Sequence, residues 1–117
     1  MTEWHDDQPI YRQLAQLMRS RIIAGSLGEG EPLPSVRQVA AQEQINPLTV
    51  SRAYQTLVDE GLLEKRRGVG MFVAAGARDA ALSRERRRFL DEEWPSLKRR
   101  IELLGLSPKE LLSGGIR

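Results

Sequence analysis

The chain of 117 residues has no cysteine, a single histidine, few aromatic residues (5%) and no long hydrophobic run. Without cysteine, disulfides, thiolate zinc sites and thiol nucleophiles are excluded. No apolar run approaches the ~18 residues that span a bilayer, and the acidic N-terminus lacks a signal-peptide pattern. We therefore expect a cytoplasmic protein without membrane contact. His5 stands beside two aspartates on a polar terminus, which is typical of a solvated residue. We expect no metal and no cofactor.

Charge is nearly balanced over the whole chain, with a formal net charge of +2. Residues 1–76 hold 8 Lys+Arg and 9 Asp+Glu, a balance of −1, whereas residues 77–117 hold 10 and 7, a balance of +3. The net charge therefore does not indicate whether the partner is a nucleic acid. The positions of the cations along the chain are more informative. The length favours one small domain with an extension. We place the domain at residues 1–76 and the extension at residues 77–117.

A short helix with clear ends lies between Asn46 and Gly61. Asn46 suits the N-cap, Pro47 the first helical position and Gly61 the residue that ends a helix. At 100° per residue, one face is apolar, formed by Val50, Ala53, Tyr54 and Leu57. The other face carries Leu48, Ser51, Arg52 and Gln55, with Thr49 at its margin. Small residues, an arginine and an amide suit a helix in the DNA major groove. The alternative is an ordinary amphipathic surface helix.

Two helices are predicted before this one. Apolar residues recur at helical spacing from Pro9 to about Ala24, and residues 1–8 before them are expected to be unanchored. A link rich in Gly and Pro follows, and Ser35 then opens a short helix with the S-x-x-Q spacing of a capping box. Ser35 and Arg37 lie where a helix start favours a phosphate, although capping and solvation would also explain them. Two helices joined by so short a turn predict a helix-turn-helix.

A β-hairpin is predicted at residues 62–73, where two short apolar-edged segments flank a tip with three cations and two glycines. Lys65, Arg66 and Arg67 concentrate positive charge, and Gly68 permits close approach to a backbone. A hairpin packed on a helix-turn-helix is a winged helix, whose wing lies across the phosphates or the minor groove. The fold class predicted is mainly α with a small β-hairpin: a winged helix-turn-helix followed by a helical tail.

Four sequence blocks, at residues 9–14 (PIYRQL), 33–40 (LPSVRQVA), 46–57 (NPLTVSRAYQTL) and 60–73 (EGLLEKRRGVGMFV), resemble the DNA-binding half of the GntR superfamily of bacterial transcription regulators. The resemblance implies that operator DNA is contacted by Arg37, Thr49, Ser51, Arg52, Arg67 and Gly68. Ser35 and Lys65 are added as candidates for backbone contact, and Leu48 and Gln55 for base contact. Leu48 stands where a polar Asn is usual, so it could make only apolar contact, for instance with a thymine methyl.

The tail carries an apolar stripe that is predicted to mediate dimerisation, formed by Leu82, Phe89, Leu90, Trp94, Leu97, Ile101 and Leu104. These residues fall within about 140° on one helix of about 27 residues, kinked at Pro95; the alternative is two helices, the first ending at Trp94. A helix this long cannot bury its stripe in so small a chain, which favours a second copy as partner. Residues 107–112 are predicted to form a capped short helix. A short helical tail resembles the YtrA-like subfamily.

These observations predict a sequence-specific DNA-binding transcriptional regulator, a homodimeric repressor of a palindromic operator. The family analogy adds control of a transporter operon. The alternative is a non-catalytic protein-interaction module on a winged-helix scaffold. No catalytic constellation is present in the sequence, so an enzyme is not expected. Nothing in the sequence indicates a small-molecule effector.

Overall fold

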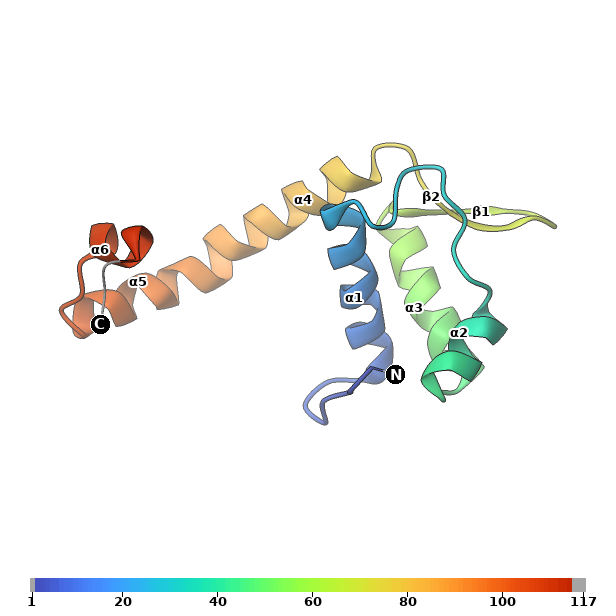
Figure 1. Cartoon of the computed structure of the whole chain (residues 1–117), viewed down its shortest axis with the longest axis horizontal. Helices are drawn as coiled ribbons and strands as arrows, with labels where there is room; N and C mark the ends of the chain where they lie inside the picture. Colours follow the sequence, from blue (N-terminus) through green and yellow to red (C-terminus); the bar gives the residue numbers. More distant parts are fainter. Residues whose placement is uncertain (1, 115–117) are drawn as a thin grey trace. The chain divides into compact units, whose positions relative to one another are not determined.

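The computed structural model describes residues 2–114 of the chain. The elements in order are α1 (Ile10–Ala24), α2 (Val36–Glu43), α3 (Pro47–Asp59), β1 (Leu63–Arg66), β2 (Gly70–Val73), α4 (Ala77–Arg88), the π-helical turn η1 (Phe89–Glu93), α5 (Trp94–Leu103) and α6 (Pro108–Ser113). They divide into two compact units, Met1–Leu82 and Ser83–Arg117. The predicted fold class is confirmed: three helices and a hairpin form the first unit, and the C-terminal portion is helical (Figure 1).

Helix ends follow the local signals in the sequence. Gly25 closes α1 in the left-handed conformation, with φ 87°. Ser35 and Gln38 form a complete capping box at the start of α2, each side chain bonded to the backbone of the other residue. The side chain of Asn46 accepts from the N–H of Leu48 at 2.8 Å, and Gly61 has φ 78° just after α3. The predicted helix-turn-helix is therefore present with the predicted boundaries.

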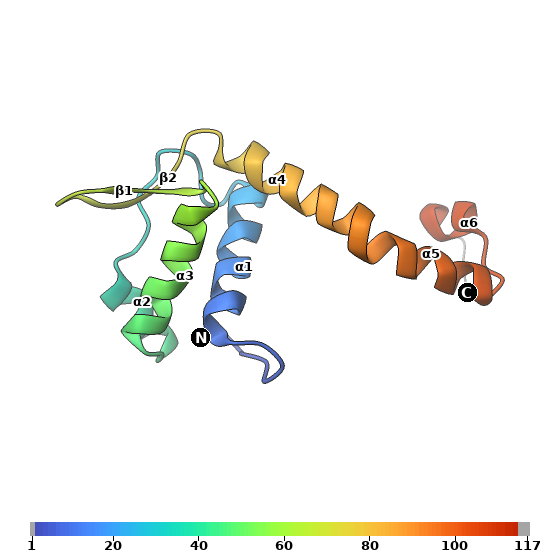
Figure 2. The same ribbon diagram turned by 180° about the vertical axis from the view of Figure 1, so that it is seen from behind.

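The core of the first unit lies between α1, α2, α3 and the hairpin. Both ribbon views show α1 running beside α3, with the hairpin leading away from the end of α3 (Figures 1 and 2). All four residues predicted for the inner face of α3, Val50, Ala53, Tyr54 and Leu57, are buried. Ala77 and Ala81 of α4 are also fully buried, so the beginning of α4 packs with the first unit rather than with the tail.

A bidentate ion pair joins α1 to the end of α3. Arg19 donates from Nε and Nη2 to the two carboxylate oxygens of Glu60 at 2.7 and 2.6 Å. The two side chains are only 15% and 12% exposed. Paired N–H donors on one carboxylate fix direction as well as distance. The pair therefore holds the C-terminal end of α3, which leads into the wing, against α1.

The hairpin pairs Leu63 with Val73 through to Arg66 with Gly70 in antiparallel register. The Gly- and Pro-rich link before α2 forms backbone hydrogen bonds with β2. The sequence did not predict this pairing. The N–H of Leu33 donates to the carbonyl of Met71 at 2.8 Å, and the N–H of Val73 donates to the carbonyl of Glu31 at 2.9 Å. The link therefore covers the outer edge of β2 and supports the wing.

The segment before α1 is anchored over residues 2–8, so the prediction of an unanchored terminus is wrong there. The side chain of Gln13 accepts from the N–H of His5 and donates to its carbonyl at 2.8 and 2.7 Å. The N–H of Thr2 donates to Glu43 at 2.7 Å, and this hydrogen bond lowers the pKa of that carboxyl. Trp4 packs against the core. The polar composition of this segment could not predict these contacts, because they are made with residues 8 and 41 positions away in the sequence.

The tail is helical without interruption from Ala77 to Leu103, so the single-helix prediction is correct and the alternative break at Trp94 is wrong. The chain accommodates Pro95 through η1, where the N–H of Trp94 donates to the carbonyl of Phe89, five residues back. Pro95 then lies in the first turn of α5, directly after the π turn. Single π turns of this kind occur within α-helices, and proline is one of the features at which helices depart from regular geometry.

The π turn also changes which side chains align. In a regular α-helix Phe89 and Trp94 would point about 140° apart, but their rings stack with centroids 6.5 Å apart. The predicted helix at residues 107–112 is present as α6, with Ser107 accepting from the N–H of Glu110. Residues 115–117 of the predicted tail lie outside the described residues.

Candidate nucleic-acid interface

The outer face of α3 is exposed along the predicted reading positions. Leu48 is 76% exposed, Ser51, Arg52 and Gln55 are exposed, and Thr49 at the margin is half-buried. The buried inner face of α3 packs against α1 and α2, so the outer side chains project from a helix that is held in place by the core. The structure thus gathers Leu48, Thr49, Ser51, Arg52 and Gln55 on one solvent-facing surface.

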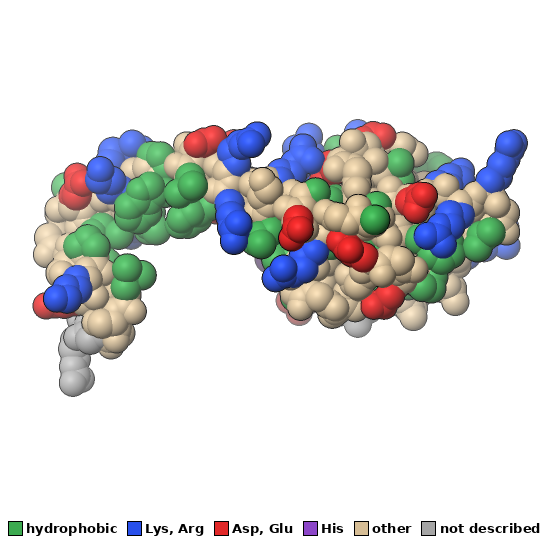
Figure 3. Space-filling view, turned by 90° about the horizontal axis from the view of Figure 1, so that it is seen from above, with side chains coloured by type: hydrophobic (Ala, Val, Ile, Leu, Met, Phe, Trp, Pro, Cys, Tyr) green, Lys and Arg blue, Asp and Glu red, His purple; other side chains and the backbone are tan. Residues whose placement is uncertain are grey.

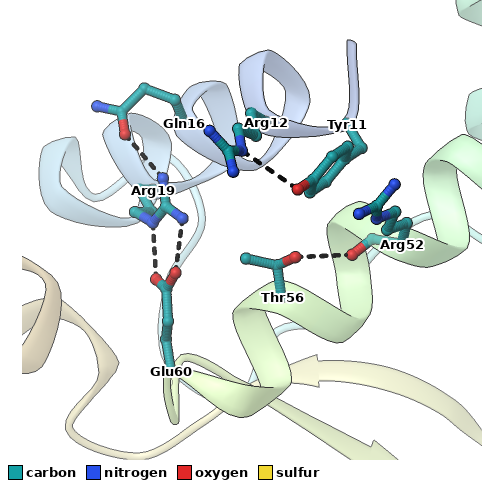
Figure 4. Close-up of polar contacts among 7 residues, drawn as sticks. All are labelled: Tyr11, Arg12, Gln16, Arg19, Arg52, Thr56 and Glu60. Atoms are coloured by element: carbon teal, nitrogen blue, oxygen red, sulfur yellow. Dashed lines mark hydrogen bonds and ion pairs between the residues drawn. The ribbon is translucent and has the colours of Figure 1, made fainter. Parts of the chain in front are cut away.

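Two of these side chains already have partners within the protein. The amide of Gln55 donates to Asp59 at 2.8 Å. A bidentate contact with adenine needs both the donor and the acceptor of a Gln amide, so Gln55 must leave Asp59 to make one. The guanidinium carbon of Arg52 lies 3.9 Å from the centroid of the Tyr11 ring (Figure 4). Sequence reasoning missed Tyr11, because it belongs to α1 and meets Arg52 only in the folded unit.

The start of α2 carries Ser35, which is exposed, and Arg37. The hydroxyl oxygen of Ser35 accepts from the N–H of Gln38 at 3.1 Å, which is the capping role that its position predicts. A groove of about 590 Å³ separates this helix start from the wing, and Ser35, Lys65 and Gly68 all line it. The structure therefore brings Ser35, Lys65 and Gly68 to one groove, while Arg37, Arg52 and Arg67 lie outside its lining.

The three cations of the wing are not equivalent. The guanidinium of Arg66 lies 4.1 Å from the centroid of the Phe72 ring and 3.6 Å from the carboxylate of Glu64. All three side chains are exposed; Lys65 and Arg66 both line the groove, and Arg67 does not. Arg66 differs from the other two by these contacts with its own hairpin, while Lys65 and Arg67 are the predicted contact cations.

The wing tip is a tight turn closed by the N–H of Val69, which donates to the carbonyl of Arg66 at 3.0 Å. Gly68 has φ 74°, and a Cβ there would meet nothing within 4 Å. The glycine requirement is therefore conformational rather than steric. Val69 is 71% exposed at this tip, an apolar contact candidate that the sequence reading did not single out.

Tyr54 connects the reading helix to the start of α2. Its hydroxyl donates to the carbonyl of Pro34 at 2.6 Å, and burial raises its pKa to about 12. Because Pro34 directly precedes the cap residue Ser35, this bond fixes one end of the groove relative to α3. Only the folded structure identifies Tyr54 as more than a core residue.

The residues predicted for the dimer surface lie mostly in helical segments without buried side chains. Figure 3 shows hydrophobic side chains gathered along this part of the molecule. Phe89, Leu90, Leu97 and Leu104 are 42%, 58%, 44% and 58% exposed. Leu82, Trp94 and Ile101 are half-buried. Within residues 2–114 no helix is long and apolar enough to cross a membrane, and the same residues hold no cluster of metal-ligating side chains.

An exposed reading helix, a capped helix before it and a basic hairpin after it, all on one small core, define a winged helix-turn-helix DNA-binding protein. A family model described as bacterial regulatory proteins, gntR family, matches residues 10–73. The chain belongs to the GntR family, as the four sequence blocks predicted. It is a DNA-binding transcriptional regulator rather than an enzyme.

Similar proteins extend this assignment. The chain is 32% identical over 112 residues to the HTH-type transcriptional regulator YhcF of Bacillus subtilis, covering 96% of this chain and 91% of YhcF. It is 41% identical over 70 residues to the transcriptional repressor YtrA of the same species, covering 60% of this chain and 54% of YtrA. A solved GntR-family regulator from Bacteroides thetaiotaomicron superposes with a TM-score of 0.71 at 36% identity, covering 89% of this chain and 90% of that one. The predicted relation to YtrA-like regulators is confirmed.

Proposed function

We propose that the chain is a homodimeric repressor that reads a palindromic operator with the outer face of α3. The observation that carries the proposal is the exposed set on α3, which combines an apolar group, hydroxyls, an arginine and an amide on a helix fixed to its core. Arg52 supplies the bidentate donors that suit guanine, and Leu48 suits a thymine methyl. Ser51 and Thr49 allow close approach at the start of the helix.

The groove between α2 and the wing is the proposed path of one DNA strand. Lys65 and Gly68 line it from the wing and Ser35 lines it from α2. Arg67 at the tip and Arg37 in the first turn of α2 add positive charge. Contacts of this kind position the protein on the phosphates, whereas the α3 residues read the bases.

The tail is the proposed dimerisation element. Among the described residues, seven of the nine exposed large hydrophobic side chains lie beyond Ser83: Phe89, Leu90, Leu97, Leu103, Leu104, Leu106 and Leu112. Of these, Phe89, Leu90, Leu97 and Leu104 belong to the predicted stripe, and an exposed apolar stripe of this kind marks an interaction site in a monomer. A second copy offers the same stripe, and two-fold pairing of identical surfaces is the commonest arrangement of soluble oligomers. We therefore propose that the boundary after Leu82 separates the unit that reads DNA from the unit that pairs two copies of the chain.

A dimer would read two half-sites about one helical turn, ~10 bp, apart in an inverted repeat. Repression is supported by the name of YtrA, a transcriptional repressor to which the reading unit is 41% identical. Regulation of a transporter operon, and a cytoplasmic location, follow from the family analogy. The alternative was a protein-interaction module on a winged-helix scaffold. Because the chain belongs to a family of DNA-binding regulators, no observation favours that alternative.

Selection of bound duplexes from a random pool, followed by sequencing, tests the proposal. The expected result is an inverted repeat with half-sites about 10 bp apart. A pool without any enriched sequence would refute sequence-specific reading, and an enriched single half-site would refute the dimer. Sedimentation of the protein with and without the selected duplex then gives the stoichiometry.

A further inference from the structure

The aromatic ring of Tyr11, in the first turn of α1, lies against the reading helix. The side chain is half-buried and packs against the core. Its hydroxyl accepts from Nε of Arg12 at 3.2 Å, and its ring lies beneath the guanidinium of Arg52 at 3.9 Å (Figure 4). The hydrogen bond from Arg12 is the main cause that lowers the pKa of Tyr11, and the charges of Arg12 and Arg52 act in the same direction.

Nothing else in the described residues holds the Arg52 head group. Within residues 2–114 its guanidinium forms no ion pair. The hydroxyl of Thr56 donates to the backbone carbonyl of Arg52 at 2.9 Å and so does not hold the guanidinium. A carboxylate partner would compete with DNA for the N–H groups of arginine. A ring does not, because the cation–π contact depends on charge and the ring quadrupole and leaves the in-plane donors available.

We propose that Tyr11 is a specificity-determining positioning residue, which holds Arg52 ready for a bidentate contact with a base. The inference rests on the proposed base-reading role of α3. A free arginine loses rotamer freedom when it binds, and a side chain already held in its bound orientation loses less. Tyr11 thus acts through Arg52 and not by its own contact with a base.

Replacing the ring and keeping its bulk tests this role. Tyr11→Leu should lower the ratio of operator to random-DNA affinity by about two- to fivefold, the range of a solvent-exposed cation–π contact. Tyr11→Phe is the matched control, because it keeps the ring and removes only the hydroxyl that Arg12 bonds. It should keep the wild-type ratio. In an Arg52→Ala background, Tyr11→Leu should have no further effect on the ratio.

A second readout needs no DNA. In the free protein the side-chain Nε–H and Cδ protons of Arg52 should show an upfield ring-current shift, retained in Tyr11→Phe and lost in Tyr11→Leu. Melting temperatures report whether the variants fold. If Tyr11→Leu is unstable, Tyr11→Met, whose flexible side chain fills irregular gaps, takes its place.

The outcomes separate the two proposals. Wild-type protein that enriches no sequence refutes base reading, and the role of Tyr11 with it. Wild-type protein that enriches an operator, with a ratio unchanged in Tyr11→Leu, refutes the role of Tyr11 alone. An effect of Tyr11→Leu that persists without Arg52 also refutes it, since the residue would then act by another route.

Discussion

The first unit and the tail place their apolar side chains in opposite ways. Every buried hydrophobic residue of the described chain lies at or before Ala81, whereas η1, α5 and α6 have no buried residue. The first unit therefore has a hydrophobic core of its own. The apolar side chains of η1, α5 and α6 are not buried in any core. The comparison agrees with the proposal that the first unit folds alone and reads DNA, while the tail pairs with a second copy.

The largest expected effect comes from removing the tail after Leu82. The cut follows Leu82 and not residue 77, because Ala81 is fully buried with the first unit. The truncated protein should be a folded monomer, and its affinity for a palindromic operator should fall by orders of magnitude because it can engage only one half-site. Sedimentation and a DNA titration measure both quantities. A truncated protein that remains dimeric would contradict the division of roles.

A single substitution sharpens the same comparison. Leu97→Asp should also give a monomer, because a charge is not tolerated unpaired in a buried interface. Leu103 is 86% exposed and lies off the predicted stripe, so Leu103→Asp is the matched control and should remain a dimer. Equal sedimentation of the two variants would place the interface elsewhere.

Arg52→Ala, in the first unit, should cost about 1–3 kcal/mol of binding free energy on the operator and much less on random DNA. The reason is that the variant can no longer bond a base through two donors, and it also has one charge fewer. Arg21→Ala removes the same charge from the last turn of α1 and should leave the discrimination between sequences unchanged. If Arg52→Ala weakens binding equally on both duplexes, Arg52 contacts only phosphate.

The wing should contribute a smaller, sequence-independent effect. Lys65→Ala and Arg67→Ala should each reduce the slope of log affinity against log salt by about 0.9 for each phosphate that the variant no longer neutralises. Arg66→Ala is the control, because Arg66 is already bound to Phe72 and Glu64 and should change the slope less. Titrations at several salt concentrations measure it, and three equal slopes would argue against the distinction between the cations.

The smallest effect concerns stability alone. Tyr54→Phe removes the bond to Pro34 and should lower the free energy of unfolding by about 1 kcal/mol without altering dimerisation. Since burial raises the pKa of Tyr54 to about 12 from 10, the folded state holds the proton more tightly. Stability from this group is complete below pH 10 and is lost as pH rises toward 12. Urea unfolding of both proteins across this range should show a larger loss in the wild type than in Tyr54→Phe.

Local signals in the sequence predicted most of the fold. Asn46, Pro47, Ser35 and Gln38 each act within a few residues of their own position, so their roles can be inferred without knowledge of the tertiary structure. The inner face of α3 followed from periodicity for the same reason. The cations of the wing and most of the outer face of α3 are exposed, and their contacts with DNA remain predictions.

Contacts between distant residues could not be predicted in this way. Tyr11 meets Arg52, and Arg19 meets Glu60, across 41 positions of sequence in each pair. Such contacts depend on how α1 packs against α3, which periodicity does not specify. The π turn was missed because a stripe computed at 100° per residue assumes an unbroken α-helix.

The π turn makes the tail tolerant of a change in length. A helix that closes one turn with an i→i+5 bond holds one residue more than its axis length requires. Loss of a single residue between Leu90 and Glu93 would let that turn relax into a regular α-helix, and the side chains from Trp94 onward would keep their phase relative to the helix before Phe89. In a regular α-helix the same deletion would rotate them by about 100°. One residue can thus be lost at this turn without disturbing the apolar surface that the tail presents.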